Sequence, residues 1–232
     1  MKRRDFLKGI KGATPIVLGF LPIGLAFGVL AVQAGLSIAE VFLMSLLVYA
    51  GSSQFIAVGL IGAGASIGAI IITTFLVNSR HILMSASLAP YMKKISNKLL
   101  TIIGFGVTDE TFAVAIGEVP QVENKAGYFL GLSITSHLSW VASTVIGAIA
   151  GNLIPNPEVL GLHFALPAMF IGLLVLQLSN RLSYLIAAIA LVLSLFFKEL
   201  IPGNWYIILA SVLAATIGVI IESCQEKSSS SS

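Results

Sequence analysis

The chain has 232 residues, of which 57% are hydrophobic and only 10% are charged. A soluble domain carries about 25% charged residues, so this chain has too little polar surface to stay folded in water. This excludes most cytosolic enzymes, secreted modules and nucleic-acid-binding proteins, and although the net charge is +3, the basic residues mostly flank apolar runs. The single cysteine excludes an intramolecular disulfide and a cysteine-based zinc cluster. The composition indicates an integral membrane protein.

Residues 1–12 form a basic segment ahead of the first apolar run. They hold five basic residues, and the run that begins at Ala13 is long enough to cross a bilayer core of about 30 Å. Such a segment also resembles an export signal, but everything that follows is membrane-like rather than soluble. Because basic residues favour the cytoplasmic side, we predict a cytoplasmic N-terminus.

Apolar stretches of membrane length follow one another with little polar sequence between them. They cover 13–35, 38–61, 65–89, 99–118, 126–151, 159–179, 182–200 and 204–222. We therefore predict an all-α polytopic bundle of about six to eight transmembrane segments, forming one transport domain over 13–222. The remaining residues, 223–232, end in a serine run that can bury nothing, and we predict a disordered tail.

The distribution of lysines argues against eight simple crossings. If every segment crosses, Lys93, Lys94 and Lys98 fall on the opposite side from the basic N-terminus. If 65–89 and 99–118 instead enter and return, these lysines join it, as the positive-inside rule prefers. Irregular backbone at membrane depth is tolerated only around a protein-lined cavity. The charge pattern therefore favours six spans with two broken or re-entrant segments.

Arg80 lies within an apolar run, where a charged side chain is costly unless it is paired or faces water. Asn78 and His81 belong to a polar stripe of helical spacing that continues to Ser85. The pattern predicts a helix that faces substrate, with Arg80 offering its guanidinium to a carboxylate. The alternative is that Arg80 extends to the interface and only fixes the depth of the helix.

Asp109 and Glu110 follow a glycine-rich break and a natural helix N-cap, Thr108. One interpretation is a capped interfacial helix whose two acids point into water. The other places a carboxylate in a cavity, where it could bind an ammonium group or carry a proton. On that interpretation both acids are candidates for substrate binding and proton coupling.

A short polar run, Tyr49–Phe55, interrupts the second apolar stretch. Gly51 lets the backbone deviate, and Ser52, Ser53 and Gln54 can replace lost backbone hydrogen bonds or bind substrate. Small residues at this place are equally typical of close helix packing. For a second polar stripe, from Ser133 to Thr144, we favour packing.

Enzyme signatures are absent from the sequence. It has no metalloprotease motif and no glycine-rich phosphate loop, and none of its histidines has acidic neighbours at metal-ligand spacing. We predict no catalytic residues, no metal and no cofactor.

Four motifs together resemble the AzlC-type family, which forms the large subunit of branched-chain amino acid exporters. They are GFLPIGLAFG at 19–28, YAGSSQF at 49–55, TFLVNSRHILMSASLAP at 74–90 and TDETFA at 108–113. The resemblance implies a bacterial inner-membrane protein that exports valine, leucine, isoleucine or methionine by secondary coupling. It also implies a small partner membrane subunit of the AzlD type.

The residues are compatible with that function. A cavity lined by Arg80, by Asp109 or Glu110, and by 52–54 could hold a zwitterion, and Met84, Phe55 or Phe112 could contact an aliphatic side chain. We predict a proton-coupled exporter. The alternatives are a permease for another small solute and a membrane scaffold subunit that does not transport.

Overall fold

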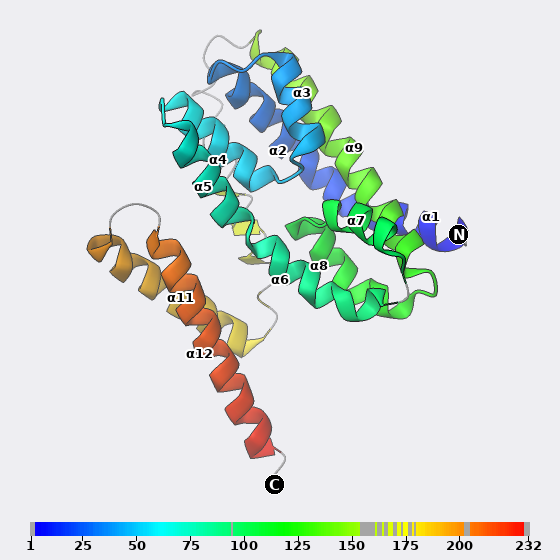
Figure 1. Ribbon diagram of the computed structural model, residues 1–232, viewed down its shortest axis with the longest axis vertical. Helices are drawn as coiled ribbons and strands as arrows, with labels where there is room; N and C mark the ends of the chain where they lie inside the picture. The colour runs from blue at the N-terminus through cyan, green and yellow to red at the C-terminus, as the bar shows by residue number, and fades with distance from the viewer. Residues whose placement is uncertain are drawn as a thin grey trace. The chain divides into compact units, whose positions relative to one another are not determined.

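The computed structural model describes most of the chain as helices (Figure 1). The described residues are 3–93, 95–153, 161, 164, 167–168, 171–172, 174–175, 178, 180–201 and 205–229. They form two compact units, Met1–Ile171 and Gly172–Ser232. The predicted all-α fold is confirmed.

Long apolar helices form the spans of this fold. Within the described residues four are long and apolar enough to cross a membrane: α2 (Thr14–Gln33), the run Ile67–Met92, α9 (Lys125–Gly151) and α11 (Arg181–Leu200). A helix of 20 residues is about 30 Å long, which matches the bilayer core. The predicted segment 159–179 falls mostly outside the described residues.

Helices α2 and α9 pack through small residues and run parallel. A Cβ atom at Gly28 would collide with the backbone of Thr144, and one at Gly147 would collide with the carbonyl of Leu25. Glycine at these positions lets the two backbones approach closely, which stabilises helix pairs in membranes. This pair forms the centre of the first unit.

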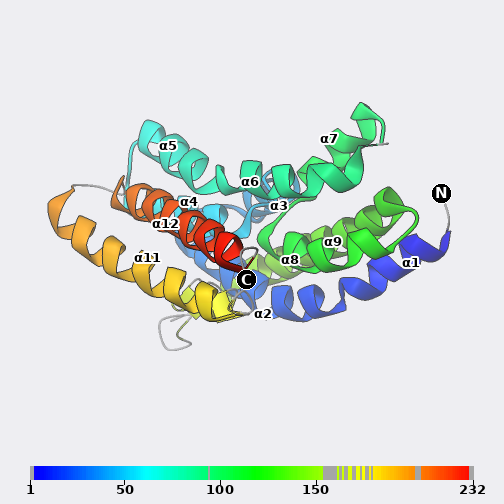
Figure 2. The same cartoon turned by 90° about the horizontal axis from the view of Figure 1, so that it is seen from below.

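The basic N-terminal segment forms a helix of its own, α1 (Arg3–Gly12), beside the first turns of α9 (Figure 1, Figure 2). The two helices are in close contact at Gly9, where a Cβ atom would collide with the Tyr128 carbonyl oxygen of α9. The buried Asp5 accepts a hydrogen bond of 2.9 Å from the backbone nitrogen of Asn124, just before α9. The first residues of the chain are thus part of the packed unit.

Helices α3 (Ile38–Leu47) and α4 (Gly51–Gly62) form a hairpin. At 10 and 12 residues they measure about 15 and 18 Å, each too short to cross the core. Gly62 lies against Ala34, which directly follows α2. The segment therefore begins and ends at the same end of the unit, as the chain reversal in Figure 1 shows.

A second hairpin, α7 (Asn97–Phe105) and α8 (Asp109–Glu118), enters from the opposite end. Lys93, before α7, and Glu123, after α8, line one cavity of about 510 Å³. The Lys125 ammonium, at the start of α9, lies 5.4 Å from the centre of the Tyr91 ring in the short helix before Lys93. The structure thus gives 99–118 the predicted course, entering and returning.

Segment 65–89 is broken, as predicted, but the prediction that it enters and returns is wrong. Helices α5 (Ile67–Asn78) and α6 (Arg80–Leu88) break at Ser79, but the run continues through the short helix η1 (Ala89–Met92) to the other end. The segment that reverses is 38–61. Whether 65–89 or 38–61 reverses, Lys93 lies on the side of the N-terminus. The charge pattern therefore could not distinguish the two possibilities.

In the second unit, α11 packs against α12 (Trp205–Ser229), with Gly218 of α12 close to the Ile186 side chain. Helix α12 continues to Ser229 and so includes part of the tail predicted as disordered from 223. Residues 222–227 (ESCQEK) contain several good helix formers, which extend the helix beyond the apolar run. Residues 230–232 lie outside the described part.

Candidate functional site

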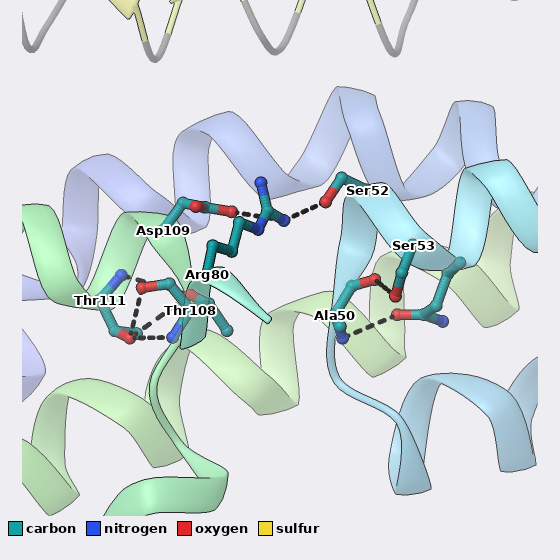
Figure 3. A network of polar contacts seen from close by, with 8 residues as sticks. Ala50, Ser52, Ser53, Arg80, Thr108, Asp109 and Thr111 are labelled. Atoms are coloured by element: carbon teal, nitrogen blue, oxygen red, sulfur yellow. Dashed lines mark hydrogen bonds and ion pairs between the residues drawn. The ribbon is translucent and has the colours of Figure 1, made fainter. Parts of the chain in front are cut away.

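Three helix N-termini meet at one polar centre. Arg80 is the first residue of α6, Asp109 the first of α8, and Ser52 lies in the first turn of α4. Arg80 Nη2 lies 2.8 Å from Asp109 Oδ2 and donates a hydrogen bond to Ser52 Oγ (Figure 3). The Arg80 and Asp109 side chains are 27% and 17% exposed, and Ser52 is buried. The breaks in three helices thus bring an ion pair and a hydroxyl together.

A capping box at the start of α8 positions Asp109. Thr108 Oγ1 accepts a hydrogen bond from the Thr111 backbone nitrogen, and Thr111 Oγ1 accepts one of 2.8 Å from the Thr108 nitrogen (Figure 3). Thr111 also donates to the Gly106 carbonyl at 2.8 Å. The predicted N-cap is confirmed. Of the two acids in the first turn, Asp109 pairs with Arg80, while Glu110 is partly exposed beside it.

The turn between α3 and α4 is held by side chains that follow it. Tyr49 has a φ of +39°, a left-handed conformation that non-glycine residues rarely adopt. Ser53 Oγ donates to the Ala50 carbonyl at 2.9 Å, and Gln54 Oε1 accepts from the Ala50 nitrogen at 3.3 Å. Of the three polar residues predicted here, Ser52 therefore reaches Arg80, whereas Ser53 and Gln54 stabilise the turn.

Gln54 also connects the hairpin to α9. Trp140 Nε1 donates to Gln54 Oε1 at 3.0 Å, and Gln54 Nε2 donates to Ser45 Oγ at 3.3 Å. Thr144 Oγ1 donates to the same serine at 2.9 Å. All four residues are buried, so the stripe on α9 packs, as its pattern indicated. Sequence reasoning missed Ser45, whose signal is a lone hydroxyl in an apolar helix.

Two polar atoms beside the ion pair are buried without a hydrogen-bond partner among the described residues. They are Asn78 Oδ1 and His81 Nε2, on either side of the α5–α6 break. Most buried polar atoms in proteins are hydrogen-bonded, and unpaired ones usually mark a place for water or a ligand. Both residues stand within two positions of Arg80, and water or a ligand could satisfy these atoms.

The three residues expected to contact an aliphatic substrate, Met84, Phe55 and Phe112, all pack against the hydrophobic core. Phe55 is buried and packs edge-on against Phe27, with ring centres 5.2 Å apart. Met84 and Phe112 are partly buried and pack against the same core. Phe55 therefore contributes to core packing.

The profile of the family described as AzlC protein matches residues 15–154. A Bacillus subtilis (strain 168) protein named branched-chain amino acid transport protein AzlC is 33% identical over 209 residues, covering 89% of this chain and 80% of that protein. The Escherichia coli (strain K12) inner membrane protein YgaZ is 32% identical, covering 79% and 77%. An Archaeoglobus fulgidus membrane protein is 39% identical, covering 78% and 79%. No solved structure matches significantly.

The profile covers more than half of the chain, including both hairpins and the Arg80–Asp109 centre. The relatives are named as membrane or transport proteins, in agreement with the long apolar helices. The chain is a membrane protein of the AzlC family.

Proposed function

We propose that this chain is a secondary transporter subunit that exports hydrophobic amino acids such as valine, leucine, isoleucine and methionine. The observation that carries the proposal is the Arg80–Asp109 ion pair at the junction of three helix N-termini. The relative from Bacillus subtilis named for branched-chain amino acid transport supports the substrate class.

The centre suits the two charges of an amino acid. Helix N-termini carry partial positive charge, so the ends of α4, α6 and α8 add to the charge of Arg80 and favour an anion. Asp109 supplies that anion when substrate is absent. An entering substrate can place its carboxylate on the Arg80 guanidinium and its ammonium on Asp109, so both charges stay paired during the exchange.

Ser52 and the unpaired atoms of Asn78 and His81 can complete the site. Ser52 Oγ already accepts from Arg80, and its hydroxyl can turn toward a bound carboxylate. Asn78 Oδ1 is an acceptor, suited to an ammonium group, and His81 Nε2 can accept or donate according to its tautomer. Ser53 and Gln54 stabilise the turn between α3 and α4 and are not part of the proposed binding site.

Proton coupling through Asp109 and Glu110 is part of the proposal. Both stand in the first turn of α8, and the sequence has no nucleotide-binding loop that would indicate ATP-driven transport. Replacing Asp109 with Asn and Glu110 with Gln, singly and together, should abolish exchange driven by a pH gradient. Unchanged pH-driven exchange in all three variants would remove both acids from the coupling mechanism.

The proposed location is the bacterial inner membrane, with the N-terminus in the cytoplasm and a small AzlD-type partner subunit. The end of the first unit that holds α1 also holds Lys93 and Lys125. This clustering supports a cytoplasmic position under the positive-inside rule. The name of the Escherichia coli relative agrees with the membrane.

Efflux from preloaded cells tests the function. Cells loaded with labelled valine, leucine, methionine, lysine and glutamate are compared with and without this chain, alone and with the small subunit. We expect faster loss of the aliphatic amino acids only, and only with both subunits. An Arg80→Gln variant should still bind the partner and lose the flux; normal flux in that variant would favour a scaffold.

A further inference from the structure

An apolar cavity lies between α6 and α7, close to the Arg80–Asp109 centre. Its volume is about 180 Å³. One wall is formed by α6 and η1 and the other by α7 and the loop before α8. The residues that matter for the argument are Ser85, Leu88, Met92, Ile103, Gly104 and Val107.

Both walls lead directly to the charged centre. Ser85 comes four residues after His81, and Leu88 three residues after Ser85, so they continue the helical stripe that includes His81 and its unpaired nitrogen. On the other wall, Val107 stands two residues before Asp109. A ligand bound at the ion pair would therefore have polar groups on one side and this apolar cavity on the other.

The size and lining of the cavity select a class of side chain. An apolar cavity of about 150 Å³ is known to hold benzene, so about 180 Å³ accommodates the four-carbon side chain of leucine or isoleucine. Leu88, Met92, Ile103 and Val107 offer only apolar surface, and Ser85 is a small polar residue at the end nearer the ion pair. A charged side chain would lose its hydration there without gaining a partner.

We infer that this cavity receives the aliphatic side chain of the transported amino acid, while Arg80 and Asp109 hold its carboxylate and ammonium groups. The inference rests on the proposed function and adds the residues that determine specificity. A transported amino acid with a side chain too short to reach the cavity, such as alanine, would bind the charged centre and leave the cavity unfilled.

Gly104 offers a direct test, because a Cβ atom built there meets no atom within 4 Å. Because Gly104 lines the cavity, a Gly104→Leu substitution adds an apolar side chain at its wall without a collision at the first carbon. The ratio of leucine, isoleucine or methionine efflux to alanine efflux should fall about tenfold or more. This is the change expected when a pocket loses one or a few methylene contacts with its substrate. Gly104→Ala provides the milder version if the larger variant does not reach the membrane.

Gly117 on α8 gives the matched control. It too has no atom within 4 Å of a built Cβ and does not line the cavity. Gly117→Leu should leave the ratio of leucine to alanine efflux unchanged. Labelled leucine binding to purified protein in lipid nanodiscs, competed with alanine, gives the same comparison without a gradient.

The outcomes separate the two proposals. If the wild-type chain moves leucine but Gly104→Leu leaves the leucine-to-alanine ratio unchanged, the cavity assignment is overturned and the function stands. An equal loss for every amino acid also overturns it and indicates a structural or lipid-filled cavity. If the wild-type chain with its partner neither binds nor moves any amino acid, the function and the cavity assignment fail together.

Discussion

Gly62, at the end of α4, lies against Ala34, at the end of α2: a Cβ atom on the glycine would be 3.5 Å from that of the alanine. This contact requires residues 38–62 to return to the end from which they started. The loops at Gly35 and Ala65 must therefore share one side of the membrane, while Lys8 and Lys93 share the other.

Cysteine labelling tests this arrangement. The native Cys224 is first replaced with serine, and single cysteines are then placed at Lys8, Gly35, Ala65 and Lys93. With an impermeant maleimide, 35 and 65 should react from one side, and 8 and 93 from the other. Eight simple crossings would instead put 35 and 65 on opposite sides.

The Arg80–Asp109 pair should behave as a coupled unit in stability measurements. Arg80→Gln or Asp109→Asn leaves the opposite charge without this partner, and because both groups are partly exposed each change should cost about 1–3 kcal/mol. The double variant should be more stable than the sum of the two losses predicts. Thermal unfolding of the four proteins in detergent, without amino acid, gives the comparison. Strict additivity would show that the pair contributes no interaction energy.

Two glycines of α2 should differ sharply in their tolerance of valine. At Gly28 the new side chain would collide with the backbone of α9, whereas a Cβ atom at Gly19 meets nothing within 4 Å. The same substitution changes helix propensity equally at both positions. Gly28→Val should lose at least about 1–3 kcal/mol of stability, and Gly19→Val much less. Size-exclusion profiles of fluorescent fusions at increasing temperature measure both. Similar losses would show that the close α2–α9 contact contributes little.

Substitutions of Gln54 and Ser52 should have different effects, the first on stability and the second on substrate binding. Gln54→Leu removes the acceptor of Trp140 and the donor to Ser45, so it should cost about 1–3 kcal/mol while the KM of the folded protein stays the same. Ser52→Ala removes one partner of Arg80 and should raise KM with little change in melting temperature. A raised KM in Gln54→Leu together with a lowered melting temperature in Ser52→Ala would instead assign Gln54 to binding and Ser52 to stability.

Sequence patterns located the polar centre because charge is costly in an apolar run. Arg80 is singled out by that cost, Asp109 and Glu110 by the break and N-cap before them, and Ser52 by the glycine that precedes it. The sequence could not tell which of the adjacent acids meets Arg80, because the choice depends on the rotation of α8 about its axis. It also could not separate Ser52 from Ser53 and Gln54, since all three can either bind a ligand or stabilise a turn.

The topology was harder to predict than the helices. The apolar stretch 38–61 has the length of a single crossing, and its reversal depends on the Tyr49–Ala50 turn, held by Ser53 and Gln54. Those contacts form only after the chain has folded, so length and hydropathy favour a span. The position of Lys93 was predicted for the wrong reason: the reversal occurs one segment earlier.

The two hairpins enter the first unit from opposite ends, and each brings a helix N-terminus to Arg80. A solute arriving from either compartment would meet a similar pair of short helices, with the polar centre beyond them. On such a path the direction of net flux is set by the driving gradients and not by the route. For the proposed exporter, net flux would follow the combined gradients of solute and coupling ion, so collapsing or inverting those gradients should stop or reverse it.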